Sequence, residues 1–165
     1  STGIQAGQGV IAPLVGRGEH ILSDRDNHAS IVAGNMLAAS LNINVVRYRH
    51  NDMEDLEKRL SKLPLEDGKL IATDGVFSTF GSVVSLDDIA ALGKKYNANV
   101  VVDDAHAFGV IGPGGKGTAH HFGVEDDVDL MICTFSKTLA SIGGFVVGDE
   151  KVINYLIFLS TPYFF

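Results

Sequence analysis

The sequence predicts an α/β fold, in which a mostly parallel β-sheet is flanked by helices. Two observations lead to this prediction. Short apolar runs alternate along the chain with stretches of helical periodicity, which is the pattern of βα units. The run Val100-Val101-Val102 is also continuous and β-branched, as is typical of a strand covered on both faces. Polar residues at the carboxyl ends of such strands are therefore the first candidates for a ligand site.

Six segments have the length and composition of strands. Each is a short apolar run, and the stretches between most of them are long enough for the crossover helices that parallel strands require. In chain order, we expect strands at His20–Ser23, Asn44–Tyr48, Lys69–Thr73, Asn99–Asp103, Asp129–Thr134 and Gly144–Val147.

Three segments between these strands have helical periodicity. The range His28–Ala39 places apolar side chains four residues apart, and Asp52–Leu63 carries an apolar stripe. Ser85–Tyr96 begins with Ser85 as the expected N-cap, and Asp88 three residues later resembles a capping box.

Length and composition predict one globular domain. The chain has 165 residues, of which 45% are hydrophobic and 20% are charged. A chain of this size buries roughly 70% of the surface that it exposes when unfolded, so it needs no disulfide to hold a core. The net charge of −7 argues against nucleic acid as the main partner, because phosphate binding needs a basic face. No apolar run reaches the roughly 20 residues of a membrane span.

The single cysteine, Cys133, excludes an intramolecular disulfide. No set of cysteines and histidines has the spacing of a zinc site, and the adjacent His120 and His121 would point apart on a helix or strand. We therefore expect no metal site and a reducing, cytoplasmic environment.

Asp103-Asp104-Ala105-His106 directly follows a strand of the buried type. Two carboxylates and an imidazole are costly to remove from water, and such groups are often found in active sites. The same pattern also fits a solvated turn. Both interpretations stay open on the local sequence alone.

The strand ending at Thr134 continues into Phe135-Ser136-Lys137. A lysine in an apolar pocket has a lowered pKa, and its neutral amine can form a Schiff base. The alternative is an ordinary surface lysine. The hydroxyls of Thr134 and Ser136 favour the first interpretation, because together they can hold a phosphate.

Other polar residues also follow predicted strands. His28 could face a ligand or cap a helix locally, and Ser78 has the same ambiguity. The segment Gly112–Thr118 lacks the spacing of a phosphate-binding Walker motif and predicts a surface turn. Arg47, Arg49 and His50 predict a solvated strand end.

Several of these strand ends match one protein family in order. The segments Ser23–Ser30, Asp74–Ser78, Asp103–Gly109 and Thr134–Gly144 together resemble the α-oxoamine synthases, which include serine palmitoyltransferase-like and 8-amino-7-oxononanoate synthase-like members. These are pyridoxal 5'-phosphate (PLP) enzymes of fold type I. Within the family, Thr134–Gly144 is more similar to the serine palmitoyltransferase-type branch, and Thr73–Ser78 to the aminoketobutyrate branch.

The resemblance implies roles for the residues around the cofactor ring. Lys137 would form a Schiff base with PLP and would deprotonate the substrate at its α-carbon. Asp103 would pair with the pyridine nitrogen and keep it protonated, so that the ring can accept the electrons of a carbanion. His28 would stack on the ring, and His106 would lie near the phenolic oxygen and the substrate. Lys137 and His106 are thus the expected catalytic residues.

The resemblance also implies contacts with the cofactor's oxygens. Ser78 would lie within hydrogen-bonding reach of the phenolic oxygen. Thr134 and Ser136 would hold the phosphate, together with the backbone N–H groups of Gly3 and Ile4 at the start of a helix whose dipole favours an anion.

By the same resemblance, residues 1–165 would form the PLP-binding core of a large domain, without the family's N-terminal segment and C-terminal small domain. Two chains would share each active site in a homodimer. The implied reaction condenses an amino acid with an acyl-CoA thioester, releases CO₂ and gives an α-aminoketone. Two alternatives stay open: a PLP-dependent class I/II aminotransferase, and a catalytically incomplete fragment or partner subunit.

Overall fold

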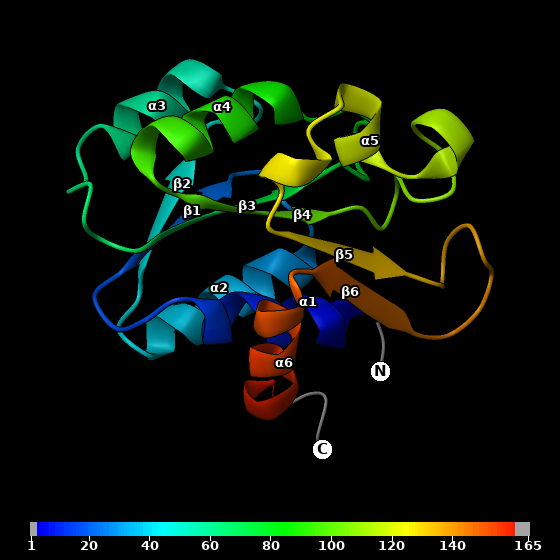
Figure 1. The fold of residues 1–165 in the computed structure, drawn as a ribbon, viewed down its shortest axis with the longest axis horizontal. Coiled ribbons are helices and arrows are strands. Elements are labelled where there is room, and N and C mark those ends of the chain that lie inside the picture. The colour runs from blue at the N-terminus through cyan, green and yellow to red at the C-terminus, as the bar shows by residue number, and fades with distance from the viewer. Residues whose placement is uncertain (1–2, 161–165) are drawn as a thin grey trace.

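A computed structural model describes residues 3–160 as a six-stranded sheet with helices on both faces (Figure 1). The strand order is β2-β1-β3-β4-β5-β6. All neighbouring strands are parallel except β6, which runs antiparallel to β5. The strands are β1 (His20–Asp24), β2 (Asn44–Tyr48), β3 (Lys69–Asp74), β4 (Asn99–Asp103), β5 (Leu130–Thr134) and β6 (Gly144–Gly148).

The helices form two outer layers, as Figure 1 shows. One face of the sheet is covered by α1 (Gly3–Ile11), α2 (Ala29–Ser40) and α6 (Glu150–Leu159), and the other by α3 (Met53–Leu60), α4 (Leu86–Tyr96) and α5 (Thr118–Phe122). Short 3₁₀ segments occupy Ala12–Leu14, Pro113–Gly115 and Glu125–Asp127. No helix within residues 3–160 is long and apolar enough to cross a membrane.

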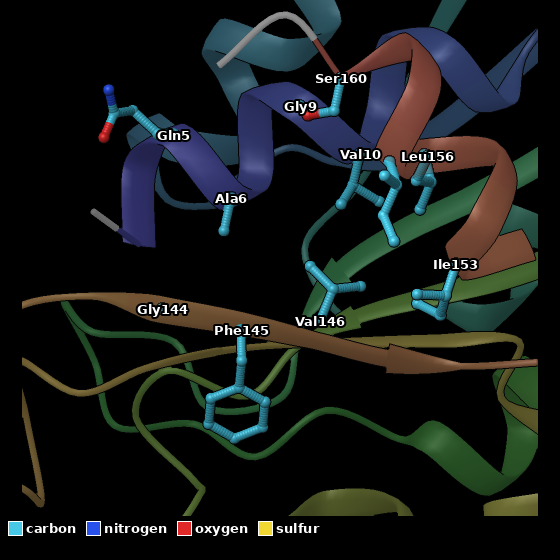
Figure 2. Close-up of a pocket in the computed structure, with 11 residues that line it drawn as sticks. Gln5, Ala6, Gly9, Val10, Gly144, Phe145, Val146, Ile153, Leu156 and Ser160 are labelled. Carbon is cyan, nitrogen blue, oxygen red and sulfur yellow. The ribbon is translucent and has the colours of Figure 1, made fainter. Parts of the chain in front are cut away.

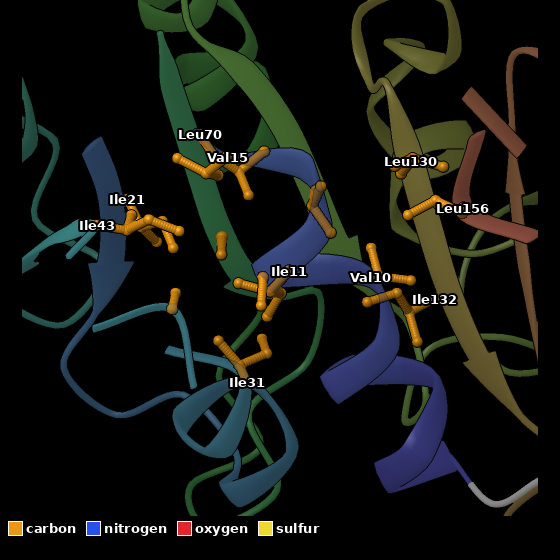
Figure 3. Close-up of a cluster of buried hydrophobic side chains, with 14 residues drawn as sticks. Val10, Ile11, Val15, Ile21, Ile31, Ile43, Leu70, Leu130, Ile132 and Leu156 are labelled. Atoms are coloured by element: carbon orange, nitrogen blue, oxygen red, sulfur yellow. The ribbon is translucent and has the colours of Figure 1, made fainter. Parts of the chain in front are cut away.

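The central strands are buried on both faces because successive side chains enter opposite cores. In β1, Ile21 packs into the cluster beneath α1 and α2, whereas Leu22 packs into the cluster beneath α3 and α4. In β4, Val101 belongs to the first cluster, and Val100 and Val102 to the second. Figure 3 shows the first cluster, in which Ile11, Ile21, Ile31, Leu70 and Ile132 come from helices and strands far apart in sequence.

The predicted fold class and all six predicted strands are confirmed, with ends that differ by at most one residue. The three predicted helices are also present, and His28 and Asp52 lie at the N-caps of α2 and α3. Ser85 is the N-cap of α4, as predicted, but its side chain makes no capping hydrogen bond. Its φ of −79° and ψ of 70° depart from the extended backbone of most N-caps.

Two expectations about surface segments need correction. Arg47 and Arg49 are exposed as predicted, but the His50 side chain is only 20% exposed and lies within hydrogen-bonding distance of Asp24. The segment from Gly112 forms the predicted turn up to Lys116, whereas Thr118 is fully buried. His50 and Thr118 each have a carboxylate partner that is distant in sequence, which a local pattern does not reveal.

The core beneath α3 yields a stability prediction. Leu56 is fully buried, and Leu56→Ala removes apolar contacts and leaves a cavity, so we expect the free energy of unfolding to fall by about 2–5 kcal/mol. Leu65 is 59% exposed, and Leu65→Ala serves as the control with an expected change within about 0.5 kcal/mol. Chemical denaturation of the two variants compares them, and equal losses would contradict the packing described.

Candidate active site

Buried polar residues gather at the carboxyl ends of the parallel strands. Asp24, Asp74, Asp103 and Thr134 are the last residues of β1, β3, β4 and β5, and each is at most 5% exposed. Asp74 and Asp103 are paired in the register of β3 and β4, so their strands end side by side. The sheet therefore brings several polar groups to one edge, where ligands of open α/β sheets bind.

A cavity of about 360 Å³ opens at this edge. It brings together six of the residues that the sequence predicts for the site. They are His28, Asp103, His106, Thr134, Ser136 and Lys137.

Asp103 is the buried anion of this cavity. Its carboxylate accepts hydrogen bonds from the Ser30 hydroxyl (3.1 Å) and the Ala105 backbone N–H (3.0 Å). No lysine, arginine or histidine of residues 3–160 forms an ion pair with it, and burial raises its pKa. A buried carboxylate of this kind is suited to a ligand group that brings a positive charge.

Two imidazoles flank the cavity. The ring centroids of His28 and His106 lie 6.3 Å apart, with an angle of 64° between the rings. His28 caps α2, since its Nδ1 accepts from the Ser30 backbone N–H (3.2 Å), and it also lines the cavity. The two interpretations of His28 are thus compatible. Partial burial and the positive charge of Lys137 lower the pKa of His106, which favours its neutral form.

The loop after β5 carries hydroxyls and a lysine. The Thr134 hydroxyl lies 2.9 Å from that of Ser136 and donates to the Gly143 carbonyl (3.1 Å). Lys137 lines the cavity and is exposed within residues 3–160. It lies in a loop whose residues 136–142 are all exposed and project beyond the sheet (Figure 1).

Three other residues that were predicted to contact the cofactor are not among those found to line this cavity. Ser78 is exposed and does not line this cavity. Gly3 and Ile4 form the start of α1, the helix that the resemblance placed there. Their predicted cofactor contacts stay predictions.

The structure adds polar residues for which the sequence suggested no individual role. Asp74 accepts a hydrogen bond from the His28 backbone N–H (2.7 Å). Asn27 donates to the Ala72 carbonyl (2.8 Å) and accepts from the Asp74 backbone N–H (3.0 Å), so it joins the His28 loop to β3. Asp74 could have been identified from the sequence, because it lies at the carboxyl end of a strand, as Asp103 does.

Asp104 anchors the loop that carries His106. It is fully buried and accepts hydrogen bonds from both the backbone N–H and the hydroxyl of Thr118. A Cβ atom at Gly75 or Gly117 would lie 2.0 Å from an Asp104 carboxylate oxygen, so only glycine fits at either position. Asp103 and Asp104 are therefore buried, and the alternative of a solvated turn is wrong.

A second cavity, of about 330 Å³, lies between α1, β6 and α6 (Figure 2). Apolar side chains such as Val10, Val146, Ile153 and Leu156 point toward it. No charged residue among those described lines it, so it lacks the groups that would hold an ionic ligand.

Comparison with known proteins identifies the family. Residues 1–165 match the family model described as aminotransferase class I and II. The chain belongs to this family. Serine palmitoyltransferase from Sphingobacterium spiritivorum is 53% identical over 94% of this chain and 38% of that protein. 8-Amino-7-oxononanoate synthase from Thermoanaerobacter pseudethanolicus is 42% identical over 99% of this chain and 41% of that protein.

Solved structures agree with this assignment. Serine palmitoyltransferase from S. paucimobilis with a bound PLP–myriocin aldimine has a TM-score of 0.93 and 40% identity, over 99% of this chain and 40% of that one. These similarities confirm the resemblance to the α-oxoamine synthases and the fold type I architecture. The chain spans 38–41% of the length of these relatives.

Asp74 yields a prediction of pH dependence. Burial and the neighbouring Asp103 carboxylate raise its pKa to about 8, from an ordinary value of 3.8. The folded protein therefore holds the Asp74 proton more tightly than the unfolded chain, so stability declines as pH rises from about 4 to about 8. Asp74→Asn removes this titration. Between pH 5 and pH 8 its free energy of unfolding should therefore fall by less than that of the unaltered protein, with a difference of at least about 1.4 kcal/mol, the equivalent of one pKa unit.

Urea denaturation of the cofactor-free protein at pH 5 and pH 8 measures the difference. Asp87→Asn changes an exposed carboxylate on α4 and is the matched control. If the free energy of unfolding falls equally in Asp74→Asn and Asp87→Asn between the two pH values, Asp74 is not the group that causes the pH dependence.

Proposed function

We propose that this chain forms the PLP-binding core of an acyltransferase that condenses an amino acid with an acyl-CoA thioester. The reaction releases CO₂ and gives an α-aminoketone. Similarity to serine palmitoyltransferase and to 8-amino-7-oxononanoate synthase supports this reaction class. The observation that carries the proposal is the buried Asp103, which faces a cavity also lined by Lys137 and the Thr134 hydroxyl.

The residues of the cavity fit PLP. Asp103 has no ion-pair partner among residues 3–160, and a protonated pyridine nitrogen would supply one. PLP, when bound, supplies an electron sink for the carbanions of the reaction. Asp103 maintains that property, because an ionised carboxylate keeps a proton on the ring nitrogen.

Lys137 and His106 are the proposed catalytic residues. Lys137, at the edge of the cavity, is the residue whose amine would hold PLP covalently and would serve as the base for the proton on the substrate α-carbon. His106 is favoured in its neutral form and can accept or donate a hydrogen bond to the substrate.

The remaining predicted residues hold the cofactor. His28 would stack on the ring, and Ser78 would bond to the phenolic oxygen. The hydroxyls of Thr134 and Ser136, only 2.9 Å apart, would hold the phosphate together with the N-terminus of α1, where the backbone N–H groups of Gly3 and Ile4 favour an anion.

The chain fits the large-domain core of a longer enzyme. Relatives are more than twice its length, which supports an N-terminal segment and a C-terminal small domain outside residues 1–165. We also propose a homodimer in which two chains share each site.

Covalent attachment of PLP tests the proposal. We expect the purified protein with PLP to show an absorbance band near the visible edge, and borohydride reduction to fix the cofactor to the peptide that contains Lys137. Lys137→Ala should lose both signals, whereas Lys94→Ala, an exposed lysine on α4, should keep them. Attachment that persists in Lys137→Ala would contradict the proposal, and dimerisation without any bound PLP would indicate a catalytically incomplete subunit.

The class I and II family description also covers aminotransferases, and the fate of the substrate carboxyl group separates the two reactions. With an amino acid labelled at its carboxyl carbon, an acyltransferase should release labelled CO₂ only when acyl-CoA is present. An aminotransferase would instead give a 2-oxo acid that retains the label and would need no acyl-CoA. Mass spectrometry of both products, with Lys137→Ala as the inactive control, decides between them.

A further inference from the structure

Asp24, at the end of β1, joins two loops of the sheet edge. Its side chain is completely buried. It accepts hydrogen bonds from the backbone N–H groups of Asp26 (2.8 Å) and Asn51 (2.7 Å). Its Oδ1 atom also lies 3.1 Å from Nδ1 of His50. The Asp24 carboxylate therefore holds the loop between β1 and α2, which leads to His28, against the loop between β2 and α3.

His50 extends this connection to a third loop. Its Nε2 atom lies 3.0 Å from the Ser82 hydroxyl, in the loop between β3 and α4. Its ring and that of Phe77 form a T-shaped pair, with centroids 4.3 Å apart and an angle of 87° between the rings. Phe77 directly precedes Ser78, and its backbone N–H donates to the Ser82 carbonyl (3.0 Å). His50 thus contacts the segment that carries Ser78 at two points.

Asn51 makes parallel contacts beside His50. Its side-chain amide donates to the Val83 carbonyl (3.2 Å) and accepts from the Ser85 backbone N–H (2.9 Å). The loop between β2 and α3 is therefore the physical link between the His28 loop and the Ser78 loop. These two loops carry His28 and Ser78, which the proposed function assigns to the face of the cofactor ring and to its phenolic oxygen.

We propose that His50 is a positioning residue, which with Asp24 fixes the His28 loop relative to the Ser78 loop. The effect on cofactor binding rests on the proposed function, whereas the mechanical link does not. His50 does not line the cavity, so it acts through the two loops and not by contact with a ligand.

The chemistry of imidazole suits this role. The carboxylates that face His50 are Asp24 and Asp26, whose nearest oxygens lie 3.1 and 3.9 Å from Nδ1. The neutral ring can donate from Nδ1 to Asp24 and accept at Nε2 from the Ser82 hydroxyl. The protonated ring can donate to both oxygens. Both contacts are therefore satisfied with the ring neutral or protonated.

Three substitutions separate the parts of the link. His50→Ala removes both hydrogen bonds. His50→Asn keeps an amide N–H near the position of Nδ1 but is too short to reach Ser82, and Ser82→Ala removes only the outer contact. His120→Ala is the matched control, because His120 is a histidine outside the cavity that pairs with Glu125.

Hydrogen exchange in the cofactor-free protein measures the link directly. We expect His50→Ala to speed exchange of the Asp26 and Asn51 amides and of the Phe77 and Gly81 amides. His50→Asn should restore the first pair only, and Ser82→Ala should affect the second pair only. Unchanged exchange in these amides, or an equal increase throughout β4 and β5, would overturn the inference. If His50→Ala does not fold, the other two variants decide the outcome.

Titration with PLP, followed by visible circular dichroism, measures the functional consequence. The lost contacts should weaken PLP binding by about 10-fold in His50→Ala and change the dichroism of the bound cofactor, with partial recovery in His50→Asn. His120→Ala should bind as the unaltered protein does. Unaltered affinity and dichroism in His50→Ala would refute the positioning role even if exchange changes. If the unaltered protein binds no PLP, the proposed function fails, and the exchange result still decides on the link.

Discussion

The burial of carboxylates at one edge of the sheet is the constraint on which the site depends. Asp24, Asp74, Asp103 and Asp104 are each at most 5% exposed, and a buried carboxylate needs hydrogen-bond donors to replace water. In every case a loop supplies a backbone N–H, so the paths of the loops follow from the positions of the anions. The donors are Asp26 and Asn51 to Asp24, His28 to Asp74, Ala105 to Asp103, and Thr118 to Asp104.

The strands were predictable because their signal is local. A strand such as Asn99–Asp103 is recognised from its own β-branched residues, and it is buried on both faces as expected. Helix α6 was not predicted, although Val152, Ile153 and Leu156 form an apolar stripe that packs into the core. Helix α5, at five residues, is too short for periodicity to identify. The N-cap at Ser85 was predicted correctly, but its side-chain hydrogen bond is absent because that bond depends on backbone angles as well as residue type.

The candidate site was predictable to the extent that its residues follow strands. Asp103, His106 and Thr134 were identified in this way, and the resemblance supplied their roles. His50 and Thr118 could not be identified, since each depends on a carboxylate brought to it by the tertiary fold, Asp24 and Asp104 respectively. The exposure of Lys137 could not be predicted from the sequence either, because it depends on what packs over the loop and not on the residues within the loop.

The antiparallel direction of β6 has a consequence for how the lysine loop is assembled. Parallel neighbours are joined by long crossovers, but β5 and β6 form a hairpin in which Thr134 pairs with Gly144. The loop that carries Lys137 is closed at its base by these two residues and begins and ends at the same edge. The hydrogen bonds that close its base are short in sequence separation, whereas several of those to the aspartates, such as the bond from His28 to Asp74, span much longer stretches of chain. The hairpin that carries Lys137 and the neighbouring hydroxyls can therefore form early in folding. The contacts that join the carboxyl ends of the other strands connect distant parts of the chain and form later.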